Sequence, residues 1–201
     1  MTPPPRASLV DPTQPTLWLA IGHVVFNPLA WNIISRNEYR NKTITKLVGT
    51  PHRGVALLGT AIFVAGLSRD VVFAWAMEHQ PKLELLDTPL VKYSGYTSIA
   101  LGLLLVLSST YQLGLVNTYL GDYFGLLMEK RVTEFPFSVL EHPMYYGSTL
   151  NFFGTSLIQR SPAGLLITLS VALVYQIAQG YEGDFTGKIY AEREKKRGKK
   201  K

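Results

Sequence analysis

The sequence predicts an all-α fold: a polytopic integral membrane helical bundle with a C-terminal helical hairpin. Long apolar runs alternate with short charged connectors along the chain, which is typical of a protein that crosses a bilayer several times. Charged residues make up only 17% of the sequence, against 47% hydrophobic residues. The 201 residues suffice for one domain, so we expect a single membrane-embedded domain over 1–201.

The apolar runs and the charges between them divide this domain into an N-terminal tail at 1–15, a first membrane or interfacial helix at 16–34, membrane helices at 54–77, 90–120 and 147–180, and a basic tail at 188–201. Asn27-Pro28 is expected to break or kink the first helix, so a full crossing and a helix lying in the interface both remain open. Asp87-Thr88-Pro89 predicts a helix start, because a capping side chain is followed by a proline in the first turn. Arg69 is expected to extend toward the lipid head groups.

The stretch 147–180 is the predicted hairpin. Its first apolar part ends at Gln159 and is too short to cross a membrane at full thickness with ease. Arg160–Gly164 is a turn signal. A hairpin places 35–53, 121–140 and the basic tail on one side of the membrane, as the positive-inside rule prefers. A single straight span in this stretch would put the first of these connectors and the tail on opposite sides.

The net charge of +6 is concentrated in the tail at 193–201. A basic segment beside a membrane typically marks the cytosolic face and anionic lipid heads. We therefore expect a cytosolic tail, the bilayer as a partner, and no nucleic-acid partner. The absence of cysteine excludes disulfides, thiolate nucleophiles and Cys-ligated zinc. The four histidines lack ligand spacing, so no metal site is expected, and P-loop, dinucleotide and nucleophile-elbow motifs are absent.

Polar side chains gather at 141–151, Glu-His-Pro-Met-Tyr-Tyr-Gly-Ser-Thr-Leu-Asn, directly before apolar residues. Polar side chains at the lip of a membrane segment are costly unless they have a function, so we expect this stretch to hold a cofactor. His142 can take a proton near neutral pH, and Gly147 allows a ligand or another backbone to approach closely. The hairpin brings His142 and Tyr145 next to 181–184. The residues alone thus predict a small membrane protein with a polar site at its cytosolic lip.

The stretch 141–150, followed later by Tyr-Glu-Gly-Asp-Phe-Thr-Gly-Lys-Ile-Tyr at 181–190, resembles the phospholipid N-methyltransferases. It is most similar to the fungal phosphatidyl-N-methylethanolamine and the animal phosphatidylethanolamine N-methyltransferases. The resemblance spans nearly the whole chain, with further matched segments at 26–32, 86–89, 106–109, 118–125 and 131–137. The His-Pro-x-Tyr-x-Gly motif by itself is less specific, because isoprenylcysteine carboxyl methyltransferases and some sterol reductases look similar there.

This resemblance implies that S-adenosylmethionine is the methyl donor and that a phospholipid is the substrate. The reaction would methylate the head-group amine of phosphatidylethanolamine or its mono- and dimethyl forms, leading to phosphatidylcholine. The family also implies a multi-pass protein of the endoplasmic reticulum membrane, with the mitochondrial membrane as a second location. The oligomeric state and the methylation steps that are run remain open.

The family's cofactor positions fall on Ala100-Leu101-Gly102 and on Glu182-Gly183. Ala100 replaces a frequent glycine, which is a mild departure. The family pattern has Glu-Pro where this sequence has Gly183-Asp184, so the second of two adjacent carboxylates is missing. Asp184 could supply this carboxylate, but a shift of one residue along a helix turns the side-chain direction by about 100°. Cofactor affinity is the property that this departure affects.

Direct transfer of a methyl group from sulfonium to nitrogen requires positioning and loss of the amine proton. We expect His142 or Glu182 to be the catalytic base. His142, Tyr145 and Gly147 are expected to join the cofactor contacts. The residues expected to bind the lipid substrate are Asp122, Tyr123 and Arg131, the last of them through the phosphate.

Two other functions remain possible from the sequence. The first is methylation of another lipid-like substrate, such as a prenylated cysteine carboxylate, which needs no base. The second is a non-enzymatic membrane scaffold, which the Gly183-Asp184 departure motivates. Binding of S-adenosylhomocysteine distinguishes the scaffold from both enzymes.

Overall fold

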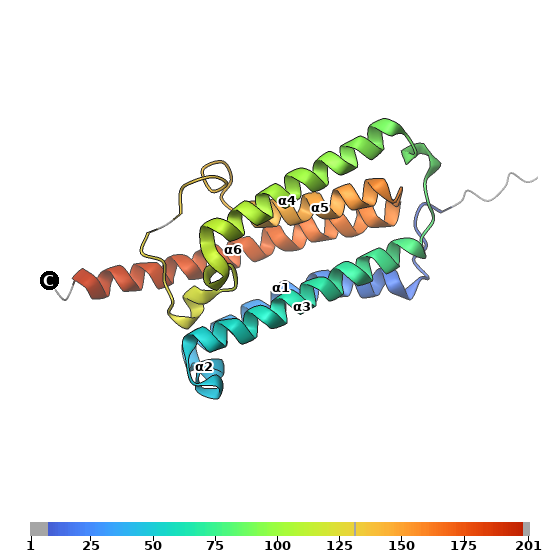
Figure 1. Ribbon diagram of the computed structural model, residues 1–201. Coiled ribbons are helices and arrows are strands. Elements are labelled where there is room, and N and C mark those ends of the chain that lie inside the picture. The colour runs from blue at the N-terminus through green and yellow to red at the C-terminus, as the bar shows by residue number, and fades with distance from the viewer. Residues whose placement is uncertain (1–7, 131, 199–201) are drawn as a thin grey trace, which may run out of the picture.

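The computed structural model describes residues 8–130 and 132–198, and every regular element in these residues is helical. Some of the connectors between the long helices contain a short helix, and a longer loop precedes α5 (Figure 1). The elements are α1 (Pro15–Asn41), α2 (Thr43–Val48), α3 (Pro51–Glu78), η1 (Glu84–Leu86), α4 (Pro89–Thr118), η2 (Gly121–Phe124), α5 (Pro143–Ile158) and α6 (Pro162–Gly198). The all-α prediction is confirmed.

The long helices lie side by side and alternate in direction (Figure 1). α2, η2, the connector 125–142 and the C-terminal end of α6 share one end of the bundle, which we call the tail end, and η1 and the turn between α5 and α6 lie at the opposite end. The described parts of 35–53, 121–140 and the basic tail, which the sequence predicts to share one side of the membrane, lie at this same end of the bundle. Among the described residues, four helical stretches are long and apolar enough to cross a membrane, namely Pro15–Asn41, Pro51–Glu78, Pro89–Phe124 and Pro162–Arg193. The fold is a polytopic bundle.

α1 runs through Pro28 without interruption, so the predicted break at Asn27-Pro28 does not occur. Proline removes one backbone hydrogen bond from a helix interior. The packing of α1 against both α3 and α6 outweighs this loss. Asn27 also ties the two helices together, because its Nδ2 donates to the carbonyl oxygen of Ala65 over 3.2 Å. Since α1 lies alongside α3 (Figure 1), this arrangement favours a crossing helix over an interfacial one.

α5 and α6 form the predicted hairpin. The chain reverses at Arg160, whose φ of 51° is left-handed, and Pro162 begins the next helix. The arms contact each other near the turn, where the hydroxyls of Ser156 and Thr168 are 3.2 Å apart. α6 continues well beyond Gly180, to Gly198, so the second arm is longer than the apolar pattern indicated.

Glycines set the close crossing of α4 and α5. A Cβ at Gly102 would lie 2.6 Å from the carbonyl oxygen of Gly147, and a Cβ at Gly147 would lie 2.7 Å from that of Gly102. A second pair repeats the contact nearer the turn, where a Cβ at Gly95 would lie 2.9 Å from the carbonyl oxygen of Gly154. Glycine pairs of this kind let membrane helices approach backbone to backbone.

Two residues with non-helical backbone angles at the tail end of α4 turn the chain toward α3 and α6. Gly114 has non-helical angles inside α4, with φ 66° and ψ 164°, and Leu120 has a left-handed φ of 63°. η2 then places Tyr123 and Phe124 in a buried cluster with Val55 of α3. Tyr123 therefore enters the interior of the bundle from the connector.

Candidate functional site

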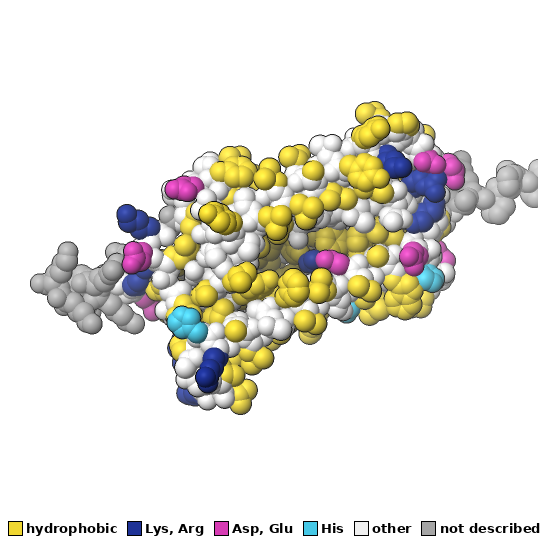
Figure 2. Space-filling view, in the orientation of Figure 1, with side chains coloured by type: hydrophobic (Ala, Val, Ile, Leu, Met, Phe, Trp, Pro, Cys, Tyr) yellow, Lys and Arg dark blue, Asp and Glu magenta, His cyan; other side chains and the backbone are white. Residues whose placement is uncertain are grey.

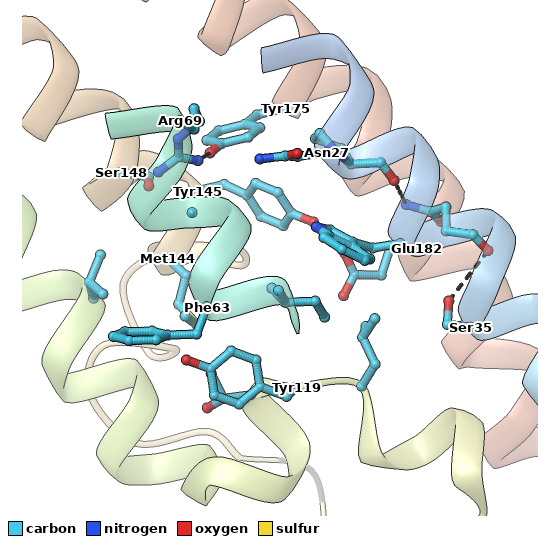
Figure 3. Close-up of a pocket in the computed structure, with 18 of the residues that line it drawn as sticks. Asn27, Ser35, Phe63, Arg69, Tyr119, Met144, Tyr145, Ser148, Tyr175 and Glu182 are labelled. Atoms are coloured by element: carbon cyan, nitrogen blue, oxygen red, sulfur yellow. Dashed lines mark hydrogen bonds between the residues drawn. The ribbon is translucent and has the colours of Figure 1, made fainter. Parts of the chain in front are cut away.

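A cavity of about 390 Å³ lies between α1, α3, the end of α4, α5 and α6. In Figure 2 it is a hollow between α3 and α4, with a basic and an acidic side chain inside it. Ligand pockets are typically of this size, about 300–1,000 Å³. Its polar lining residues come from every long helix and include Asn27, Asn32, Ser35, Arg69, Asp70, Thr118, Tyr119, Tyr123, Tyr145, Ser148, Tyr175 and Glu182 (Figure 3).

The wall nearest the tail end contains a contact between the two hairpin arms. The Tyr145 hydroxyl donates a hydrogen bond to the Glu182 carboxylate. Pro143 begins α5 immediately after His142, so Tyr145 stands in the first turn of α5 and faces α6. The Tyr145 ring packs edge-on against Tyr175 of α6, with centroids 4.9 Å apart. This places a carboxylate and a phenol together at the cavity wall.

Within the described part of the chain, three polar atoms of the lining residues are buried and have no hydrogen-bond partner: Asn32 Oδ1, Thr118 Oγ1 and the Tyr123 hydroxyl. Tyr123 is fully buried, and its ring stacks on Phe185 with centroids 5.2 Å apart and an interplanar angle of 9°. A buried polar group without a partner costs about 1–3 kcal/mol. Three such groups around one cavity indicate a ligand with polar groups of its own.

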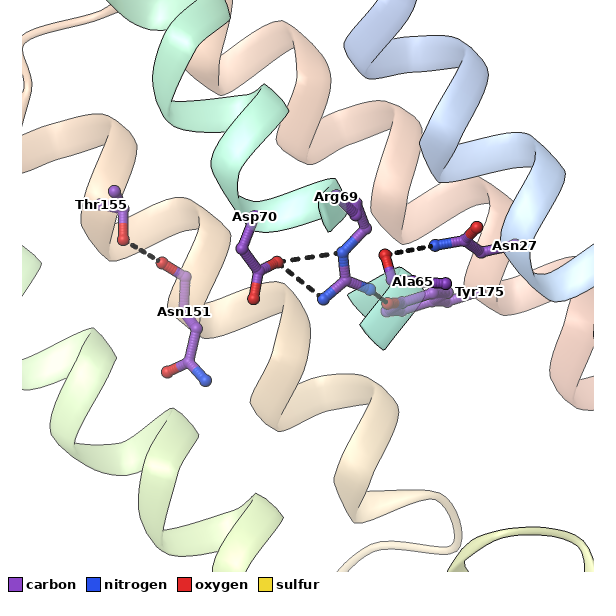
Figure 4. A network of polar contacts seen from close by, with 7 residues as sticks. All are labelled: Asn27, Ala65, Arg69, Asp70, Asn151, Thr155 and Tyr175. Atoms are coloured by element: carbon purple, nitrogen blue, oxygen red, sulfur yellow. Dashed lines mark hydrogen bonds and ion pairs between the residues drawn. The ribbon is translucent and has the colours of Figure 1, made fainter. Parts of the chain in front are cut away.

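An ion pair lies farther from the tail end. Arg69 donates to Asp70 through Nε at 3.1 Å and Nη2 at 2.8 Å, and through Nη1 to the Tyr175 hydroxyl at 2.7 Å (Figure 4). The guanidinium also lies over the Phe152 ring, 4.9 Å from its centroid. Arg69 therefore turns into the cavity instead of extending toward the head groups as expected, because Asp70 balances its charge there and Tyr175 accepts its hydrogen bond. Charged residues within membrane helices usually have a function.

The structure brings several of the expected site residues together. Glu182, Tyr145 and Tyr123 line the cavity. The His142 ring makes an edge contact with Tyr145, with centroids 6.2 Å apart, and His142 itself is absent from the lining. Asp122 accepts hydrogen bonds from the Thr186 hydroxyl at 2.9 Å and from the Tyr123 amide at 3.1 Å. Asp122 thus joins η2 to α6 and holds Tyr123 in place.

The other expected residues that the structure describes do not line the cavity. Ala100 and Leu101 are exposed on the outer side of α4, and Gly102 is buried against Gly147 at the helix crossing. Gly183 is exposed on α6. Arg131 lies outside the described residues, as does the Asp184 side chain. Their roles stay predictions.

Sequence reasoning missed Asn27, Asn32, Asp70 and Tyr175. A usable signal was present: each is a polar or ionisable side chain inside a helix predicted to lie in the membrane, where such residues are expensive. Within residues 8–130 and 132–198, no group of three or more His, Asp or Glu side chains is placed to hold a metal ion.

Comparison with known proteins gives consistent matches. The family model described as Phospholipid methyltransferase matches residues 91–193. The chain is 47% identical to the phosphatidylethanolamine N-methyltransferase of Rattus norvegicus, covering 90% of this chain and 91% of the relative. It is 49% identical to the phosphatidyl-N-methylethanolamine N-methyltransferase of Schizosaccharomyces pombe, over 88% and 91%, and 46% identical to that of Neurospora crassa, over 96% and 90%. No solved structure matches the chain significantly.

Proposed function

The chain belongs to the phospholipid methyltransferase family, and we propose that it transfers methyl groups from S-adenosylmethionine to the head-group amine of phosphatidylethanolamine or its mono- and dimethyl derivatives, leading to phosphatidylcholine. Relatives named for this reaction align with about nine tenths of the chain. This coverage favours the phospholipid substrate over a prenylated cysteine and an enzyme over a scaffold. The single structural observation that carries the proposal is the Tyr145–Glu182 contact in the cavity wall.

The residues around the cavity fit the proposed methyl donor. S-Adenosylmethionine, when bound, supplies an electrophilic methyl group on a sulfonium. Its positive charges suit a site with the Glu182 carboxylate in the wall. The unpaired Asn32 oxygen and the Thr118 and Tyr123 hydroxyls offer hydrogen bonds to its polar groups. We propose that Glu182 and Tyr145 hold the donor, with His142 at the tail-end edge of the site.

The glycines expected to bind the cofactor fit a positioning role. Gly102 and Gly147 let α4 and α5 approach closely, which fixes the position of the first turn of α5. Tyr145 stands in that turn, so these glycines set where its hydroxyl meets Glu182. Ala100, Leu101 and Gly183 remain proposed donor contacts on the strength of the family resemblance.

Glu182 is the proposed general base. An ammonium has no lone pair, so the proton must leave the acceptor nitrogen before that nitrogen can attack the methyl carbon. The carboxylate first attracts the ammonium and then takes its proton on an oxygen. The Tyr145 hydrogen bond orients the carboxylate. His142, which contacts Tyr145, remains the second proposed base.

The lipid acceptor is proposed to enter from the bilayer through the opening between α3 and α4. These two helices scarcely contact each other, and the hollow of Figure 2 lies between them. An amine anchored at the interface can then reach the cavity while its acyl chains stay in lipid. We propose that Tyr123 contacts the head group from η2 and that Asp122 supports it through Thr186. Arg131 remains the proposed phosphate ligand.

The orientation proposed for the chain places the tail end in the cytosol. Basic side chains concentrate there, at the end of α1, between α1 and α2, in α2 and in the first turn of α3, as the positive-inside rule requires for the cytosolic face. The donor is water-soluble and would reach the site from that side. The endoplasmic reticulum is the proposed location, and the whole chain is proposed to act as one membrane-embedded domain.

The proposal is tested by incubating membranes that contain the protein with radiolabelled S-adenosylmethionine and each head-group form in turn. Chromatography then identifies the labelled lipid. We expect label in the mono-, di- or trimethylated phospholipid, above the level of membranes without the protein. Label in no phospholipid, with intact binding of S-adenosylhomocysteine, would point to a different acceptor.

A further inference from the structure

A second cavity, of about 350 Å³, lies between α1 and α6, and we call it the α1/α6 groove. Its walls are mainly apolar, formed by Leu29 and Ile33 of α1 and by Val174 and Ile177 of α6. Three of these side chains, Leu29, Ile33 and Ile177, are more than half exposed in the protein alone. Arg36 and Tyr181 stand at the end of the groove nearest the tail end.

Arg36 brings a positive charge to this apolar groove. Its guanidinium lies over the rings of Phe185 and Tyr181, 4.9 Å and 5.7 Å from their centroids. Nη2 donates to the carbonyl oxygen of Tyr181 at 2.7 Å, and Nε is buried without a hydrogen-bond partner among the described groups. Among the side chains that the structure describes, no carboxylate forms an ion pair with Arg36. The charge is held in place by aromatic rings and is available to an anion.

The dimensions of the groove match one leaflet of a bilayer. Arg36 stands five residues before the end of α1 at Asn41, which is about 8 Å along a helix axis. The groove extends from Arg36 back to Val25, about 16 Å along the same axis, or about half of a 30 Å hydrocarbon core. A charged end at head-group depth and an apolar wall of this length describe the two parts of a phospholipid.

We infer that the α1/α6 groove binds a phospholipid of the tail-end leaflet, with its phosphodiester at Arg36 and one acyl chain along the apolar wall. Arginine suits this ligand because its guanidinium matches phosphate oxygens in pairs. The groove is separate from the methyl-transfer cavity, although Pro28 and Asn32 of α1 line both. The inference therefore goes beyond the proposed function and requires no turnover of the bound lipid.

The groove is also in contact with the wall of the methyl-transfer cavity. Arg36 lies over Phe185, and Phe185 stacks on Tyr123, which lines that cavity. A phosphate bound to Arg36 would thus be connected, through Phe185, to the Tyr123 ring that carries the unpaired hydroxyl.

The test is photocrosslinking of the full chain in detergent micelles, without methyl donor. The probe is a phosphatidylcholine with a diazirine in one acyl chain, and labelled peptides are mapped by mass spectrometry. We expect label on α1 around 29–33 and on α6 around 174–177. Unlabelled phosphatidylcholine should compete for the site much better than a diacylglycerol with the same chains. Because no turnover is measured, the result stands whether or not the proposed function does.

Three variants and a control sharpen the test. Arg36→Gln should weaken labelling about tenfold, the effect of losing one charge-assisted contact, and Arg36→Lys should retain most of it. Ile177→Trp should obstruct the groove from a position that is 62% exposed and therefore tolerant of a larger side chain. Leu104→Trp on the outer face of α4 should leave labelling unchanged. Label spread over all outward faces, or equal competition by diacylglycerol, would overturn the inference.

Discussion

Tyr145 donates a hydrogen bond to Glu182, 37 positions later in the chain, and thereby joins the first turn of α5 to α6 at the wall of the main cavity. The contact depends on the hairpin, which returns the chain to the tail end. It also depends on the glycine crossing of α4 and α5, which fixes α5 in the bundle. A polar pair from two distant segments thus meets at one end of an apolar bundle.

Tyr123 offers a clean test of ligand contact. Its buried hydroxyl has no hydrogen-bond partner among the residues that the structure describes, and its ring packing on Phe185 does not need that hydroxyl. Tyr123→Phe should therefore leave the thermal unfolding midpoint unchanged or raise it, because it removes a buried hydroxyl that is otherwise unpaired. If the hydroxyl bonds to donor or lipid, the dissociation constant for S-adenosylhomocysteine or the KM for lipid should rise about two- to tenfold. Unchanged values for both ligands would remove Tyr123 from the proposed site.

Gly102 tests whether the stretch 100–102 acts through packing. An added Cβ would meet the carbonyl oxygen of Gly147 at 2.6 Å, so Gly102→Ala should destabilise the protein by about 1–3 kcal/mol. The matched control is Gly22→Ala in α1, where a Cβ meets nothing within 4 Å and no loss is expected. Thermal unfolding in detergent measures both. An unchanged midpoint for Gly102→Ala together with weaker S-adenosylhomocysteine binding would show a direct donor contact instead.

The Arg69–Asp70 pair predicts a coupled effect on stability. Arg69→Gln leaves the Asp70 carboxylate without its two hydrogen bonds and should cost about 1–3 kcal/mol. The Asp70 side chain is 56% exposed, which keeps the cost below that of a fully buried charge. Adding Asp70→Asn to Arg69→Gln should restore part of the loss, as a double-mutant cycle would measure. Additive losses would mean that the two side chains act independently.

The proposed orientation can be tested because the chain contains no cysteine. Leu47→Cys in α2 and Leu85→Cys in η1 introduce single thiols at positions 80% and 78% exposed, at opposite ends of the bundle (Figure 1). In sealed endoplasmic reticulum vesicles with the cytosolic face outward, a membrane-impermeant maleimide should label Leu47→Cys directly and Leu85→Cys only after detergent is added. Labelling of both in sealed vesicles would contradict the topology.

Local sequence chemistry predicted several ends and turns of the fold correctly. Thr88 caps α4, since its Oγ1 accepts a hydrogen bond from the Val91 amide at 3.3 Å, and the turn before Pro162 lies where Arg160–Gly164 indicated. Each of these features depends on residues within a few positions of one another. The apolar runs and the basic connectors were likewise enough to give the all-α class and the shared end of the connectors.

Features that depend on tertiary packing could not be predicted in the same way. Proline predicts a break in an isolated helix, whereas α1 continues through Pro28 because its neighbours hold it on both sides. Arg69 faces the cavity because Tyr175, 106 positions away, accepts its hydrogen bond. The cavity itself is assembled from five helices, so no single segment revealed it, although the polar residues inside apolar helices marked its wall.

The most direct test of the proposed chemistry is the single-turnover rate of methyl transfer at saturating donor for Glu182→Gln. Loss of a general base lowers such rates about 10²- to 10⁴-fold, and we expect a loss in this range that lessens as rising pH deprotonates the amine in solution. Tyr145→Phe, which keeps the carboxylate, should lose less. A Glu182→Gln variant that binds S-adenosylhomocysteine and transfers methyl groups at the wild-type rate would contradict the role of Glu182 as the base.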